Sequence, residues 1–69
     1  MRVTVNGEAK QIDDGVTVSG LLAILELKPE RLAIELNRQI VRRANWAETE
    51  LHDGDRIEIV NFVGGGSLD

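Results

Sequence analysis

The sequence predicts an α+β domain in which one main helix packs across a mixed sheet of four to five strands. The chain has 69 residues, which is enough for one domain. Apolar and polar residues alternate near both ends and in the middle of the chain, as is typical of strands, while one stretch between them has the helical period. Packing that helix on one face of the sheet would bury its apolar side together with that face.

The first twelve residues predict a β-hairpin. Alternation runs on both sides of Asn6-Gly7, a dipeptide that favours a two-residue type I′ turn because both residues tolerate positive φ. Such a turn places Val5 opposite Glu8. The residues that would share the inward face are Met1, Val3, Val5 and Ile12.

A change of period after the hairpin predicts the helix. Its apolar stripe, at i, i+3, i+4 and i+7, consists of Val18, Leu21, Leu22 and Leu25. Thr17 is the expected N-cap, with Ser19 as the alternative. We expect the helix to end at Lys28-Pro29, because a residue before proline resists the α conformation.

Period two returns in the second half of the chain. Leu32, Ile34 and Leu36 form one face of a strand, and Asn37-Arg38 predicts a turn into a short strand, Gln39–Val41. The following stretch has no strand pattern and indicates a loop or a short helical turn. Trp46 lies in this stretch, where we expect it to fill the edge of the core.

The last strand is expected from Arg56 to Phe62, after a turn at 53–55. In it Ile57 and Ile59 point one way and Glu58, Val60 and Phe62 the other. A leading hairpin, one helix and a last strand beside the first give the β-grasp arrangement of ubiquitin. We therefore expect a β-grasp domain over residues 1–63 and a flexible glycine-rich tail over 64–69.

Composition narrows the classes of function. The absence of cysteine excludes disulfides and cysteine-based metal sites. A formal charge of −4 argues against nucleic-acid binding and suits a basic protein partner. The one basic cluster, formed by Arg38, Arg42 and Arg43, is interpreted as a solvated turn. With no leader and no membrane-spanning stretch, we expect a cytoplasmic protein that is a monomer when free and has no membrane partner.

Residues for catalysis are scarce. The single histidine, His52, is interpreted as a surface residue beside an acidic turn. The sequence Asp53-Gly54-Asp55 lacks the further ligands of a calcium loop, and turn chemistry accounts for it. We therefore expect no catalytic residue, no metal ligand and no bound cofactor.

The end of the chain holds the strongest functional candidates. If Val60 and Phe62 face away from the helix, they form an exposed apolar patch flanked by Glu58 and Glu35. The alternative is that Phe62 folds back over a sheet edge. Three glycines follow at Gly64–Gly66. Without Cβ atoms they could thread a narrow channel, or they could be slack at a terminus.

These features together resemble the ThiS family, the sulfur carriers of bacterial thiamine biosynthesis, almost end to end from Met1 to Gly66. The stretches that carry the resemblance are MRVTVNGEAKQI, TVSGLLAIL, LAIELNRQIV, the Trp46 segment and LHDGDRIEIVNFVGGG. The sharpest parts of the match are Asn37 with Ile40-Val41, Trp46, residues 53–60 and the ending at residues 62–66. An aspartate–glycine–aspartate turn just before a strand that runs into glycines is the strong signal among them. A family of this kind implies a carrier and co-substrate without an active site of its own.

The resemblance also implies the chemistry and the partners. An E1-like adenylating enzyme (ThiF-like) would use Mg-ATP to adenylate the carboxylate of Gly66. Sulfur from a donor such as a cysteine desulfurase would then give a thiocarboxylate, which a thiazole synthase (ThiG-like) would consume. Gly64 and Gly65 would be the channel-threading tail. The partner-docking residues would be Glu58, Val60, Phe62 and Val63.

One departure from the family pattern concerns the residues after Gly66. Members of the family normally end at the glycines, whereas here Ser67, Leu68 and Asp69 follow. We expect that a protease removes them or that they are a cloning remnant, with loss of the carrier role as the third explanation. The alternative functions are the small subunit of molybdopterin synthase (MoaD-like), and a non-covalent ubiquitin-like or TGS-like binding module.

Overall fold

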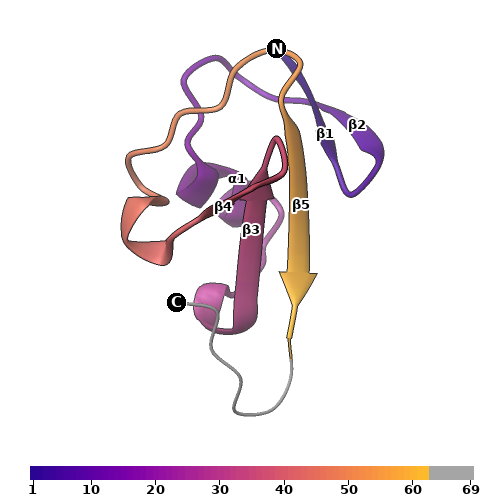
Figure 1. Ribbon diagram of the computed structural model, residues 1–69. Coiled ribbons are helices and arrows are strands. Elements are labelled where there is room, and N and C mark those ends of the chain that lie inside the picture. Colours follow the sequence, from indigo (N-terminus) through magenta and orange to yellow (C-terminus); the bar gives the residue numbers. More distant parts are fainter. Residues whose placement is uncertain (63–69) are drawn as a thin grey trace.

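The strands within residues 1–62 form one five-stranded sheet in the order β2-β1-β5-β3-β4. The fold is taken from a computed structural model, which describes residues 1–62 (Figure 1). Its elements are β1 (Arg2–Val5), β2 (Glu8–Gln11), α1 (Val18–Ile24), η1 (Pro29–Arg31), β3 (Leu32–Leu36), β4 (Gln39–Val41), η2 (Arg43–Asn45) and β5 (Arg56–Asn61).

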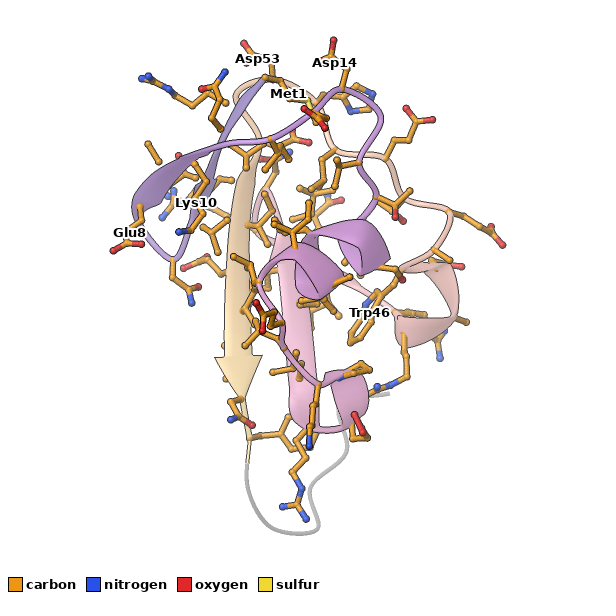
Figure 2. The ribbon with its side chains drawn as sticks, turned by 180° about the vertical axis from the view of Figure 1, so that it is seen from behind. Met1, Glu8, Lys10, Asp14, Trp46 and Asp53 are labelled. Atoms are coloured by element: carbon orange, nitrogen blue, oxygen red, sulfur yellow. The ribbon has the colours of Figure 1, made fainter. Side chains whose placement is uncertain are left out.

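The sheet is mixed, as the sequence predicts. The strand β1 runs parallel to β5, while the other neighbouring pairs are antiparallel. The helix α1 lies on one side of the sheet, behind it in Figure 1 and in front of it in Figure 2. This arrangement confirms the β-grasp prediction. The expected boundary between domain and tail, at 63–64, lies outside the described residues.

The N-terminal hairpin has the expected register, with Val5 opposite Glu8. Its turn residues Asn6 and Gly7 have φ values of 48° and 85°, which is the left-handed conformation that a type I′ turn needs. The predicted inward residues Val3, Val5 and Ile12 are all buried, and Met1 is half-buried.

The helix begins where the sequence predicts. The Thr17 side chain accepts a hydrogen bond from Gly20 N at 3.0 Å, which identifies Thr17 as the N-cap. A Cβ on Gly20 would lie 3.3 Å from a methyl carbon of Val16. Glycine at this position therefore avoids a tight contact in the first turn.

The predicted helix end is wrong, because α1 stops at Ile24 rather than at Lys28-Pro29. Glu26 has a φ of 57°, and its N–H donates to the carbonyl oxygen of Ala23 at 3.0 Å. The N–H of Leu27 donates to the carbonyl oxygen of Leu22, also at 3.0 Å. These two bonds form a Schellman C-cap, which closes the helix before proline can do so. The sequence conceals this cap because glutamate stands where glycine is usual.

We expect Glu26→Gly to raise the melting temperature. An L-residue in the left-handed region costs about 1–2 kcal/mol, a cost that glycine avoids. A net gain of about 1 kcal/mol corresponds to roughly 4–8 °C in a domain of this size. Thermal unfolding followed by circular dichroism measures the shift. Ala23→Gly, at an exposed helical position, is the matched control and should lower the melting temperature. A drop with Glu26→Gly would contradict this account of the cap.

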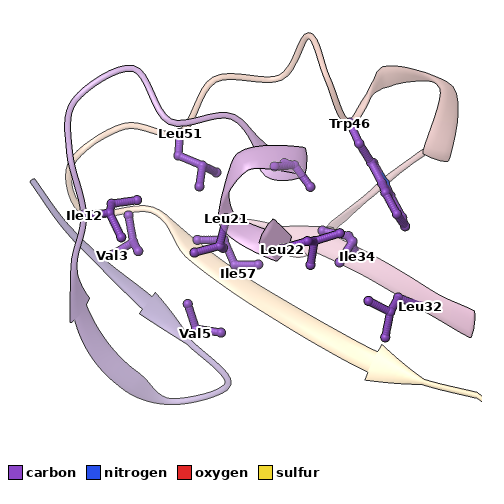
Figure 3. Packing of buried hydrophobic residues seen from close by; sticks show 11 residues of the cluster. Val3, Val5, Ile12, Leu21, Leu22, Leu32, Ile34, Trp46, Leu51 and Ile57 are labelled. Atoms are coloured by element: carbon purple, nitrogen blue, oxygen red, sulfur yellow. The ribbon is translucent and has the colours of Figure 1, made fainter. Parts of the chain in front are cut away.

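The core lies between α1 and the sheet (Figure 3). It contains Val3, Val5, Ile12, Val18, Leu21, Leu22, Leu32, Ile34, Trp46, Leu51 and Ile57. Trp46 closes one edge, as predicted, and its Nε1–H donates to the carbonyl oxygen of Val41 at 2.8 Å. The guanidinium of Arg43 lies 4.8 Å from the centre of its ring. Among residues 1–62 no helix is long and apolar enough to cross a membrane.

Candidate functional site

The strand β5 carries the candidate functional residues that lie within the described chain. Ile57 is fully buried under α1 and Ile59 is packed against the core. Side chains alternate along a strand, so Glu58 and Val60 point to the opposite face, which α1 leaves uncovered. Val60 is 51% exposed there. The predicted division of the strand between two faces is therefore confirmed.

Phe62 follows the strand and continues its pairing with β3. Its N–H donates to the carbonyl oxygen of Arg31 at 2.9 Å, although β5 itself ends at Asn61, one residue earlier than predicted. This bond carries the pairing on to residue 62, and strand alternation then assigns Phe62, which is half-buried, to the face of Val60. Phe62 thus extends the uncovered face along its own strand.

We call this surface the open face, after its position opposite α1. It consists of Ala33, Glu35, Ile40, Glu58, Val60 and Phe62. Cross-strand pairing sets Ala33 beside Val60, and Glu35 lies between Ile40 and Glu58. The result is an apolar surface interrupted by two carboxylates. Ile40 is 60% exposed, more than any other large apolar residue of the described chain.

Sequence reasoning missed Ile40 and Ala33 as members of this surface. Alternation was the signal that could have found Ile40, because consecutive strand residues face opposite sides. In the structure its neighbour Val41 packs against the core, which leaves Ile40 on the open face. What the sequence could not give is the strand order, which brings β4 beside β3 and β3 beside β5.

The two carboxylates of the open face oppose one another directly. Glu35 pairs with Glu58 across β3 and β5, and both side chains are half-buried. Among residues 1–62 neither of them takes part in an ion pair. Like charges placed opposite each other on a sheet are destabilising. A basic group from another molecule would relieve this repulsion.

The turn before β5 is held by its own side chains. The carboxylate of Asp55 accepts from the backbone N–H of His52 at 2.7 Å and from the Asn37 side chain at 3.0 Å. Asp53 accepts from the backbone N–H of Arg2 at 2.8 Å. Both aspartates thus serve turn geometry, as the sequence indicates. The side chain of His52 is 76% exposed, which agrees with its interpretation as a surface residue.

The arginine cluster is partly structural. Besides stacking on Trp46, Arg43 donates to the carbonyl oxygens of Pro29 at 2.6 Å and Glu30 at 3.3 Å. This arginine therefore ties η1 to the segment around Trp46 and does not belong to a solvated turn.

Chemical groups for catalysis do not converge in the described part of the chain. Residues 1–62 contain no group of three or more acidic or histidine side chains that could hold a metal ion. The remaining predicted site residues, Val63, Gly64, Gly65 and Gly66, lie outside the described residues. The site that can be built from geometry is consequently a docking surface at the end of β5.

Comparison with known proteins decides the family. The model of the ThiS family matches residues 3–66, which is nearly the whole chain. The chain belongs to the ThiS family. The match extends through the open face and the three glycines. A crystal structure of the thiamine biosynthesis protein ThiS from Geobacter metallireducens has the same fold, with a TM-score of 0.85 at 35% identity. The match covers 96% of this chain and 100% of the Geobacter chain.

Relatives in the ThiS family occur alone and within a longer protein. The sulfur carrier protein ThiS of Escherichia coli is 36% identical over 66 residues, which are 96% of this chain and 100% of that protein. A thiazole synthase of Paramagnetospirillum magneticum is 39% identical over 67 residues, which are 97% of this chain. The chain spans about a fifth of the length of that synthase, with 21% covered.

Proposed function

We propose that this protein is the sulfur carrier of thiamine biosynthesis, and that it acts as a carrier and co-substrate in the cytoplasm without catalysing a reaction itself. The observation that carries the proposal is the family match over residues 3–66, which includes the strand β5 and the glycines that follow it. The uncovered apolar face beside that strand supports it, because a carrier must be recognised by several enzymes.

The proposed chemistry takes place at Gly66. Once residues 67–69 have been removed, its carboxylate attacks the α-phosphate of Mg-ATP in an E1-like enzyme, which releases pyrophosphate and leaves an acyl adenylate. The terminal sulfur of a persulfide, formed from cysteine by a desulfurase, then attacks the acyl carbon and expels AMP, and a thiol reductant cleaves the acyl disulfide that results. Glycine suits this step because no side chain crowds the acyl carbon. The resulting thiocarboxylate supplies the sulfur that thiazole synthase takes up.

In this proposal the open face is the docking surface, and the glycines are the extension that carries the carboxylate to the partner's active site. Val60 and Phe62, with Val63 beyond them, give apolar contact, while Glu58 and Glu35 favour a basic partner. Gly64 and Gly65 then extend into the partner's active site. Ordering such a tail on binding opposes association, so contact at the open face has to offset that loss.

The intact mass of the untagged protein from its own cell tests the proposal. We expect a chain that ends at Gly66, of which a fraction has one oxygen replaced by sulfur. Growth without thiamine should raise that fraction. A protein that carries no sulfur under thiamine starvation, whatever its C-terminus, would contradict the carrier function.

A further inference from the structure

A groove on the helix side of the sheet lies beside the end of β5. It consists of three adjoining depressions, with volumes of about 310, 370 and 210 Å³, and Leu27 lines all of them. We call it the Leu27 groove. Asn61 of β5 lines the depressions of 310 and 370 Å³. The larger of these two is also lined by Ile59 of β5 and by Leu25 and Leu32. Leu27 itself is 39% exposed, because the C-cap of α1 turns it out of the core.

Two hydrogen bonds show which backbone groups of β5 face β3. The N–H of Phe62 donates to the carbonyl oxygen of Arg31, and the N–H of Asn37 donates to that of Arg56. In an antiparallel pair such bonds recur at every second residue, so the even-numbered residues of this strand bond to β3. The N–H and C=O of Asn61 therefore point away from β3, toward the side on which β1 lies.

The strand β1 ends before it reaches Asn61. Its pairing with β5 stops at Val5 and Ile57. At Ile59 the side-chain amide of Asn6 takes the place of a strand, since its Oδ1 accepts from Ile59 N at 2.8 Å and its Nδ2 donates to Ile59 O at 3.2 Å. Within residues 1–62 no group bonds to the N–H and C=O of Asn61. The side chain of Asn6 closes the edge at Ile59. The edge is open at Asn61, the next residue whose N–H and C=O point to this side.

An open strand edge beside an apolar groove has the features of a strand-addition site. Backbone amides of an added strand satisfy the edge, and every second side chain of that strand points to the groove. In Figure 3 the labelled Val5 and Leu32 lie on either side of β5. The occupant is thus an extended peptide segment that presents an apolar side chain toward Leu27.

We propose that this segment belongs to thiazole synthase, which adds a strand to β5 at Asn61 and seats an apolar side chain in the Leu27 groove. The inference rests on the proposed function and names a second surface for one of its partners. The synthase is favoured over the other partners because a protein named thiazole synthase, from Paramagnetospirillum magneticum, contains a stretch of 67 residues that is 39% identical to this chain. The groove and the open face lie on opposite sides of the sheet, so one can be altered without the other, and we assign the open face to the activating enzyme.

The first test compares Asn61→Pro with Asn61→Ala. Proline removes the N–H of residue 61, which no bond to β3 requires, whereas alanine keeps it. We expect Asn61→Pro to weaken binding to the thiazole synthase of the same organism about tenfold, measured by calorimetry. Asn61→Ala should bind within about threefold of wild type. In the wild-type complex, hydrogen exchange at the Asn61 amide should slow at least about tenfold.

The second test compares Leu27→Lys with Ile24→Lys and remains decisive if proline at 61 impairs folding. Ile24 is 55% exposed and lines none of the three depressions. We expect Leu27→Lys to weaken synthase binding at least about tenfold and Ile24→Lys to leave it unchanged. Both variants should keep the wild-type KM in ATP–pyrophosphate exchange with the activating enzyme.

The outcomes separate this inference from the proposed function. Equal synthase affinity of Leu27→Lys and Ile24→Lys would contradict the proposal that the synthase binds in the Leu27 groove. An Asn61 amide that is not protected in the complex would contradict the proposal that a strand is added there. Loss of pyrophosphate exchange with Leu27→Lys would show that the groove serves the activating enzyme instead. If the wild-type chain binds no synthase at all, the proposed function fails and the inference fails with it.

Discussion

A chain that ends at Gly66 will support ATP–pyrophosphate exchange with its activating enzyme, and the chain that continues to Asp69 will not. Adenylation needs a free carboxylate, and a glycine inside a peptide bond offers none. We therefore expect the rate with residues 1–69 to be at background, while residues 1–66 give saturable exchange. The measurement is incorporation of labelled pyrophosphate into ATP at equal carrier concentrations.

A third form isolates the carboxylate from the length of the tail. Residues 1–66 with a C-terminal amide keep every side chain and the open face but lack the reacting group, so this form should be inactive and should compete with the active one. Equal exchange by residues 1–66 and 1–69 would refute the free-carboxylate argument. Inactivity of all three forms would favour a non-covalent binding module.

Substitutions on the open face will raise the KM for the carrier in the same exchange assay at least about tenfold. Phe62→Ala removes an aromatic contact of the kind that dominates interfaces, and Val60→Lys places a charge in the middle of the apolar surface. The maximal rate at saturation should change less than KM, because neither residue supplies the reacting carboxylate.

Stability separates docking from folding for these two variants. Val60 is 51% exposed, so its replacement should change the free energy of unfolding by no more than about 1 kcal/mol. Thr4→Lys, on the same side of the sheet but in β1, serves as the control and should keep the wild-type KM. A large drop in melting temperature with Phe62→Ala would instead make Phe62 a core residue.

The local patterns of the chain determine most of its elements. Asn6-Gly7 commits the first twelve residues to a hairpin, because a two-residue I′ turn sets both the direction and the register of its strands. The stripe from Val18 to Leu22 and the Thr17 cap commit the next segment to a helix. These signals act over a few residues, so they can be read without knowing what the chain packs against.

The end of α1 shows where such reading fails. A proline at position 29 is a local signal, but the helix is closed earlier by a left-handed Glu26 that no propensity predicts. The C-cap turns Leu27 outward beside the end of β5. The C-cap therefore sets the length of the helix and, with it, the place of Leu27 in the groove.

For the candidate site, the sequence by itself determined the composition of β5 and the glycines that follow it. Alternation alone was enough to turn Glu58 and Val60 away from the core. Only the tertiary structure decided their neighbours, because strand order depends on pairing between distant segments. It places Glu35 opposite Glu58 and brings Ile40 to the same face. It also ends the pairing of β1 with β5 before Asn61. Side-chain direction is a property of one strand, whereas a surface and an open edge are properties of the whole sheet.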